Sequence, residues 1–389
     1  MGKDISLQAV TMGLITAFVG WASSFTVILQ GLTAVGATQD QAASGLFAAS
    51  LAMGLAGLWT SLTARQPISV AWSTPGAALL ATTGPVEGGF AAAVGAFMVC
   101  GALIAAAGYW ERLGKWVAAI PSSLANAMLA GVLFGLCLAP VKAVAQLPLQ
   151  GLAVVVVWAA VARWKRLFAV PAAVIVTLAI IAWGLRDAPD AAMALWSTPV
   201  LVVPEFGLQA IVGIALPLFL VTMASQNIPG FAVLKVYGYT PAPGPLFRLT
   251  GFFTMAASPL GGHAVNLSAL TAAMCAGPDA HADPARRYWA SATVGLAYAA
   301  LAFGAGAAAA FVAAAPPVLI QAVAGLALLG ALAGAVHAAL QDAETREAAL
   351  VTFLVTASGL SFFGISGAFW GLVAGGGLMA LSRWRRPKA

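Results

Sequence analysis

Long apolar runs separated by short breaks occupy almost the whole of this 389-residue chain, and this pattern constrains the fold most. A membrane-spanning helix needs about 20 consecutive apolar residues to cross roughly 30 Å of hydrocarbon. Hydrophobic residues make up 61% of the chain and charged residues only 8%, whereas a soluble domain carries roughly a quarter charged residues. The runs do not alternate as barrel strands do. The sequence therefore predicts an all-α polytopic membrane protein.

The breaks divide the chain into about 14 candidate transmembrane segments, seven in each half. Those of the first half lie near 8–31, 41–63, 69–83, 88–109, 117–139, 149–162 and 168–185. Those of the second half lie near 208–233, 246–258, 263–276, 286–313, 317–338, 346–361 and 364–381. Because seven is odd, two repeated halves would have opposite orientations in the membrane. This count predicts a 7+7 inverted repeat.

The distribution of basic residues gives an orientation. With 14 segments and both termini in the cytoplasm, 16 of the 18 lysines and arginines fall on the cytoplasmic side, and only Lys142 and Arg186 do not. The same residues are spread between apolar runs rather than gathered on one face, which argues against a nucleic-acid partner. The pattern predicts cytoplasmic termini and a lipid bilayer as the surroundings.

The third and tenth segments are both interrupted by helix breakers. In the third, residues 66–76 run from Pro67 through a β-prone stretch to Pro75 and Gly76. In the tenth, residues 257–266 contain Pro259 and the pair Gly261–Gly262. Non-helical backbone at membrane depth must be sheltered in protein or line a watery cavity. Two matched broken helices are the best sequence indication of a transporter's midplane site.

The polar residues near these breaks are neutral or titratable donors. None of the 12 acidic residues falls convincingly inside a predicted segment, which argues against a cation substrate and against a metal site. Helix amino termini near Thr74 and His263 would attract an anion through their unpaired N–H groups. The candidate substrate-binding residues are Ser73, Thr74, Gly76, Gln226, Asn227, Gly261, Gly262, His263 and Asn266.

Each candidate also has a structural interpretation. Ser73 and Thr74 are suited to cap a helix ahead of Pro75, and Gln226 and Asn227 could bond between helices. The following Ile228-Pro229-Gly230 would break the helix, which favours a site. For Asn266, a role in the binding site and a contact between helices are equally well supported by the sequence. His263 is the single titratable residue placed deep in a segment, so it is either the proton-coupling group or a satisfied structural histidine.

Three motifs carry a family resemblance. Residues 71–76 (AWSTPG), 225–230 (SQNIPG) and 261–266 (GGHAVN) resemble the bacterial benzoate/proton symporter family, and the resemblance extends across nearly the whole chain. That family is similar in architecture to nucleobase transporters and to sulfate-permease-type anion carriers. Nucleobase relatives carry acidic residues at the site, where this chain offers Gln226, Asn227 and His263.

The resemblance implies a core domain, a gate domain and a substrate. The core domain would comprise residues 1–110 and 208–314, and the gate domain residues 111–186 and 315–389, with an extracytoplasmic linker at 187–207. The implied function is import of benzoate or a related aromatic carboxylate by proton symport with alternating access. The implied location is the bacterial inner membrane.

Other functions stay open. The same helix termini would suit a small-anion channel, or a carrier for another organic anion or a nucleobase-like substrate. The chain contains no Walker A loop for nucleotide phosphates, which disfavours ATP-driven transport. We therefore expect a transporter and not an enzyme, without cofactors, and a homodimer is one possible assembly.

Overall fold

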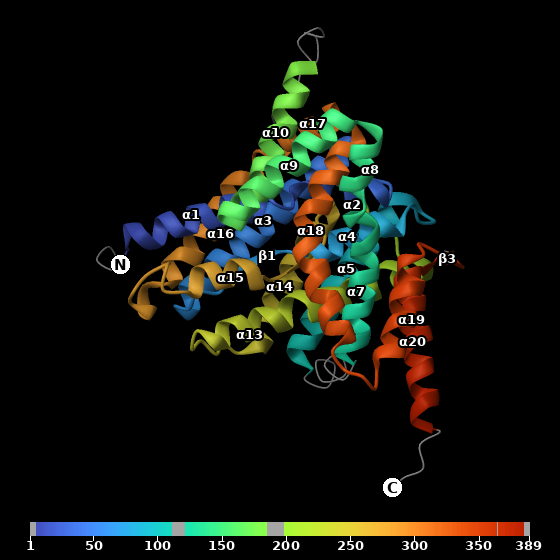
Figure 1. The fold of residues 1–389 in the computed structure, drawn as a ribbon. Helices are drawn as coiled ribbons and strands as arrows, with labels where there is room; N and C mark the ends of the chain where they lie inside the picture. The colour runs from blue at the N-terminus through green and yellow to red at the C-terminus, as the bar shows by residue number, and fades with distance from the viewer. Residues whose placement is uncertain (1–4, 111–120, 185–197, 364, 385–389) are drawn as a thin grey trace.

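The computed structural model describes residues 5–110, 121–184, 198–363 and 365–384, and helices dominate this part of the chain (Figure 1). Helices before residue 185 are α1 (Leu7–Ala22), α2 (Phe25–Ala34), α3 (Gln39–Ala64), α4 (Thr74–Thr83), α5 (Gly89–Tyr109), α7 (Ser122–Cys137), α8 (Ala139–Gln146), α9 (Pro148–Lys165) and α10 (Ala169–Gly184). Later helices are α11 (Leu208–Ala210), α12 (Leu216–Thr222), α13 (Ile228–Val236), α14 (Pro243–Ala257), α15 (Ala269–Ala276), α16 (Tyr288–Ala302), α17 (Ala305–Ala314), α18 (Pro317–Leu340), α19 (Arg346–Ala357) and α20 (Gly367–Trp384).

Short irregular helices and strands complete the described chain. Two π-helical turns, η3 (Ile211–Ala215) and η4 (Met223–Asn227), join α11, α12 and α13 into one continuous segment. The 3₁₀ turns are η1 (Arg166–Phe168), η5 (Ser258–Leu260) and η6 (Pro284–Arg286). The strands are β1 (Val70–Trp72), β2 (Val265–Leu267), β3 (Ser361–Phe362) and β4 (Ile365–Ser366).

Seven helical segments in the described ranges are long and apolar enough to cross a membrane. An eighth is counted if α16 and α17, which are bent by 60° at residues 303–304, form one crossing. The chain is therefore a polytopic helical membrane protein, as predicted. The number of 14 crossings and the 7+7 repeat stay predictions.

The first crossing is not one straight helix. Ser23 and Ser24 separate α1 from α2, and both hydroxyls donate to the carbonyl oxygen of Gly20, at 3.2 and 2.9 Å. Serine hydroxyls that bond to a preceding carbonyl compete with the helical bonds and bend a helix. The bend therefore places two serine hydroxyls in the middle of an apolar segment.

Two groups of helices pack among themselves. α3 packs on α16 and α5 packs on α14, whereas α7 packs on α18 and α19, and α19 on α20. Figure 1 shows α19 and α20 together beside α7. Small residues allow the close approaches: a Cβ built on Gly54 of α3 would lie 2.7 Å from the carbonyl oxygen of Gly295 in α16. The two groups also contact each other, because α2 packs on α18 and α4 packs on α7.

Several parts of the predicted domain division lie outside the described residues. They are residues 1–4 of the predicted core domain, residues 187–197 of the predicted linker, and residues 111–120, 185–186, 364 and 385–389 of the predicted gate domain. The described part of the predicted linker lies against α5, since the Glu205 amide donates to the Ala91 carbonyl oxygen at 3.0 Å.

A candidate anion site between two helix amino termini

A two-stranded antiparallel ribbon connects the two interrupted segments. β1 pairs with β2, and Ala71 lies opposite Asn266. The ribbon is extended at both ends, because the Ser73 amide donates to the Ala264 carbonyl (2.8 Å) and the Ser268 amide donates to the Ser69 carbonyl (3.0 Å). The paired strands provide hydrogen bonds for the backbone N–H and C=O groups that an interrupted membrane helix leaves without partners.

A short helix follows each strand. Ser73 caps α4, since its Oγ accepts from the Gly76 amide at 3.1 Å, and Pro75 lies in the first turn. Ser268 caps α15 in the same way, with Oγ accepting from the Thr271 amide at 3.4 Å. The predicted cap at Ser73 is confirmed. The prediction that the second helix begins near His263 is wrong, because β2 intervenes and α15 begins at Ala269.

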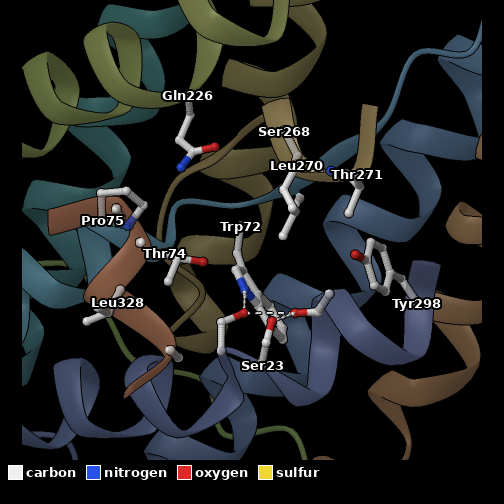
Figure 2. Close-up of a pocket in the computed structure, with 16 residues that line it drawn as sticks. Ser23, Trp72, Thr74, Pro75, Gln226, Ser268, Leu270, Thr271, Tyr298 and Leu328 are labelled. Carbon is white, nitrogen blue, oxygen red and sulfur yellow. Dashed lines mark hydrogen bonds between the residues drawn. The ribbon is translucent and has the colours of Figure 1, made fainter. Parts of the chain in front are cut away.

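A cavity of about 340 Å³ lies where these two helices begin. Its walls come from α4, α15, the bend between α1 and α2, η4, Tyr298 of α16 and a stretch of α18 from Ala327 to Ala331. Figure 2 shows Gln226 facing Trp72 and Thr74 across the cavity, with Thr271 and Tyr298 on the far side. Among the described residues, no acidic or basic side chain lines the cavity. The positive ends of the two helix dipoles lie at the cavity. The Arg166 guanidinium lies behind its wall, since a Cβ on the lining residue Gly330 would be 3.3 Å from Arg166 Nη2.

Trp72 forms an aromatic wall. Its indole nitrogen donates to Ser24 Oγ at 2.9 Å, so the serine bend in the first crossing orients the ring. Trp21 lies next to it, with ring centroids 6.2 Å apart, and Phe25 stacks on Trp21 at 4.9 Å. Of these three rings Trp72 lines the cavity, and it gives the cavity an apolar surface suited to a planar ring.

Gln226 and Asn227 are adjacent in the chain, but their side chains lie in different surroundings. Gln226 lines the cavity, and its carboxamide has no hydrogen-bond partner among the described residues. Asn227 is fully buried, and its Oδ1 accepts from the Leu267 amide of β2 at 2.9 Å. The π-helical turn η4 places these two side chains, as single π turns often do at functional sites.

The predicted helix break at Pro229 is wrong. α13 begins at Ile228 directly after η4 and continues through Pro229 to Val236. Pro229 lacks the N–H that an α-helix would bond four residues back. The preceding π-helical turn already shifts the register of those bonds, so the helix continues without a break.

His263 lies behind the cavity, not in its wall. Its side chain is fully buried, and Nε2 is 3.1 Å from the carbonyl oxygen of Ser73. A carbonyl only accepts, so Nε2 carries the hydrogen and Nδ1 is the free acceptor of the neutral ring. Nδ1 has no partner in the described part of the chain. His263 is thus linked to the cap of α4 and does not line the cavity.

Asn266 and the candidate glycines also lie outside the cavity lining. Asn266 is fully buried in β2, with Nδ2 donating to the Leu267 carbonyl at 2.7 Å. Gly261 has φ +87°, a backbone conformation that favours glycine. A Cβ on Gly262 would lie 2.8 Å from Ala257 Cβ, and one on Gly76 would lie 2.5 Å from Leu218 Cδ1. These glycines permit close packing around the ribbon.

Several lining residues were not predicted from the sequence. They are Ser23, Ser24, Ser268, Thr271, Tyr298 and the α18 stretch. Ser268 carried a usable signal, because serine before Ala269 and Leu270 is typical of a helix cap. The α18 residues carried none, since Ala327 and Leu328 look like any apolar helix. Within the described ranges no group of three His, Cys, Asp or Glu side chains could hold a metal ion.

The chain is similar in sequence to known membrane proteins. The inner membrane protein YdcO of Escherichia coli (strain K12) is 41% identical over 366 residues, which cover 94% of this chain and 93% of YdcO. The benzoate membrane transport protein of Acinetobacter baylyi is 31% identical over 390 residues, which cover 100% of this chain and 98% of that protein.

Solved structures share the fold at low identity. The transmembrane domain of a cyanobacterial bicarbonate transporter, BicA, has a TM-score of 0.58 at 15% identity, covering 97% of this chain and 98% of that chain. A structure of SLC26A9 has a TM-score of 0.63 at 14% identity and covers 96% of this chain, which spans 65% of that longer chain. These similarities support the fold alone.

The family assignment follows from the match over the chain's length. A model for the family described as benzoate membrane transport protein matches residues 3–381. Its full-length relative in Acinetobacter baylyi carries the same description. The chain therefore belongs to the benzoate membrane transport protein family, a family of inner-membrane transporters and not of enzymes.

Proposed function

We propose that this protein is a secondary transporter that imports benzoate or a related aromatic carboxylate by proton symport with alternating access. The observation that carries the proposal is the cavity between the amino termini of α4 and α15, which joins neutral donors to an aromatic wall. The absence of acidic side chains among its lining residues favours an anion over a cation.

The carboxylate would lie against the start of α4. The Thr74 hydroxyl and the Gln226 carboxamide line the cavity and have no hydrogen-bond partner in the described part of the chain. Both can donate to a carboxylate oxygen. The ring would lie against Trp72, with Tyr298 on the opposite side. The remaining candidates Ser73, Gly76, Asn227, Gly261, Gly262 and Asn266 would hold the ribbon and the helix start in place.

His263 would couple proton binding to substrate binding. Protonation adds a positive charge at the residue that donates to the Ser73 carbonyl, next to the cap of α4. A positive charge there strengthens the attraction of the cavity for a carboxylate, and the bound carboxylate favours the protonated ring in return. Each ligand would therefore promote binding of the other, as symport requires.

The proposed architecture has 14 crossings in a 7+7 inverted repeat, with cytoplasmic termini. The core domain would be residues 1–110 and 208–314, the linker 187–207, and the gate domain 111–186 and 315–389. Two matched units of strand and short helix support the repeat, and the separate packing of α7, α18, α19 and α20 supports the division. In this division the cavity would lie between the two domains, because α18 supplies one of its walls.

Uptake into proteoliposomes tests the proposal. Protein-free liposomes are the control, because neutral benzoic acid crosses lipid unaided. We expect saturable, protein-dependent uptake of benzoate with a fixed proton stoichiometry, and no uptake of aromatic amines. A benzoate current that fails to saturate would indicate a channel. Uptake of a different anion class in preference to benzoate would refute the substrate assignment.

A further inference from the structure

A second cavity of about 410 Å³ lies beyond the first along the same helices. It is lined by the end of α2, by Ala81 near the end of α4, by the end of α17 and by the first turns of α18. In the proposed orientation α2 ends on the extracytoplasmic side, so this outer cavity faces the side from which substrate arrives.

Buried residues separate the two cavities. Ser23 and Ser24, just before α2, line the inner cavity, and Gln30 of α2 lines the outer one. Val27, which lies between them in the chain, is fully buried. Ala78 of α4 and Ala324 of α18, which also lie between the two sets of lining positions, are fully buried as well. The outer cavity is therefore a separate compartment.

Gln30 is the unusual group in the outer cavity. Both its Nε2 and Oε1 are inaccessible to water, and neither has a hydrogen-bond partner in the described ranges. Buried amides without partners are rare because they lose their hydrogen bonds to water. Gln30 is one of the residues that line the cavity, and a turn of its amide toward the cavity would let a ligand there supply the missing partner.

The chemistry of the lining fits an aromatic carboxylate. Gln30 and Gln321 offer amide donors, and Leu136, Val312 and Ile320 offer an apolar surface. No charged side chain lines the cavity in the part of the chain that the structure describes, so an anion there meets neither a repelling nor a strongly attracting charge. Such a lining would hold a carboxylate weakly and release it readily.

We propose that the outer cavity is a second binding site, at which Gln30 holds the incoming aromatic carboxylate before the inner cavity opens to it. This inference rests on the proposed function for its choice of ligand. The outer site is separate from the inner cavity, and the geometry of the inner cavity does not depend on it.

Thiol protection tests the outer site directly. Ala313 is exposed and lines the outer cavity, and the neighbouring Ala314 is exposed but does not line it. Ala313→Cys and the control Ala314→Cys are labelled with a membrane-impermeant maleimide, with and without benzoate. Both are placed in a Gln226→Glu background, which is expected to weaken benzoate binding in the inner cavity. The native cysteines Cys100, Cys137 and Cys275 are buried.

We expect benzoate to slow labelling at position 313 about tenfold at ten times its dissociation constant, and to leave position 314 unchanged. Adding Gln30→Leu should abolish this protection. Absence of protection, its survival in Gln30→Leu, or equal protection by benzyl alcohol, which lacks the carboxylate, would overturn the proposal. If wild-type protein fails to transport benzoate while position 313 is protected, the proposed function falls and the outer site stands.

Discussion

A carboxylate at position 226 should weaken benzoate binding by about 20-fold to 1,000-fold. Gln226→Glu keeps the size of the side chain and places a negative charge in the wall of the inner cavity. A sphere with the cavity's volume of about 340 Å³ is about 9 Å across, so the two carboxylates would lie between about 4 and 9 Å apart. At an effective dielectric constant of about 20, Coulomb's law gives repulsion of about 4 to 2 kcal/mol, or a loss of affinity of about 1,000-fold to 20-fold.

The assay is equilibrium binding of benzoate to purified, monodisperse protein at neutral pH. Gln226→Leu separates charge from hydrogen bonding, since it loses only the hydrogen bond to the carboxylate, which costs about 1.5–3 kcal/mol or about 10-fold to 150-fold in affinity. Gln41→Glu is the matched control, because Gln41 is the third residue of a capping box on α3, where glutamate serves equally well. If Gln226→Glu binds as well as Gln226→Leu, the carboxylate does not occupy this cavity.

Three further variants probe the surroundings of the cavity. His263→Gln should spare counterflow exchange more than uphill accumulation, because glutamine can still donate to the Ser73 carbonyl but carries no proton; equal loss of both would indicate a structural role. Ser24→Ala removes the acceptor of the Trp72 indole N–H and should weaken benzoate binding up to about tenfold, and unchanged affinity in a titration would refute the role of the ring. Gly262→Val should lower the thermal unfolding midpoint in detergent, since overpacking typically costs about 1–3 kcal/mol. Gly377→Val, whose Cβ meets nothing within 4 Å, should not; equal midpoints would contradict the packing argument.

Local signals in the sequence located the first broken helix correctly. Ser73, Thr74 and Pro75 form a cap and first turn by rules that involve only neighbouring residues, and the structure has them there. The length and apolarity of the runs likewise identified a polytopic helical protein. Such features depend on the local chain alone, which is why one sequence suffices to predict them.

The errors came from interactions between distant residues. The Gly261–Gly262 break was interpreted as a helix start, but the residues after it pair with β1, nearly 200 residues earlier in the chain. That pairing turns Val265–Leu267 into a strand and moves the helix start to Ala269. No local pattern at His263 shows that its partner is the Ser73 carbonyl. The contribution of α18 to the cavity is invisible for the same reason.

The most direct test of the account is to locate the bound substrate. A bromobenzoate that competes with benzoate can be soaked into crystals of the protein, and its bromine located by anomalous scattering. The account predicts a peak in the cavity bounded by Trp72, Thr74 and Gln226, with the carboxylate directed toward the start of α4. At a saturating concentration, an empty inner cavity, or a carboxylate directed away from both helix amino termini, would contradict it.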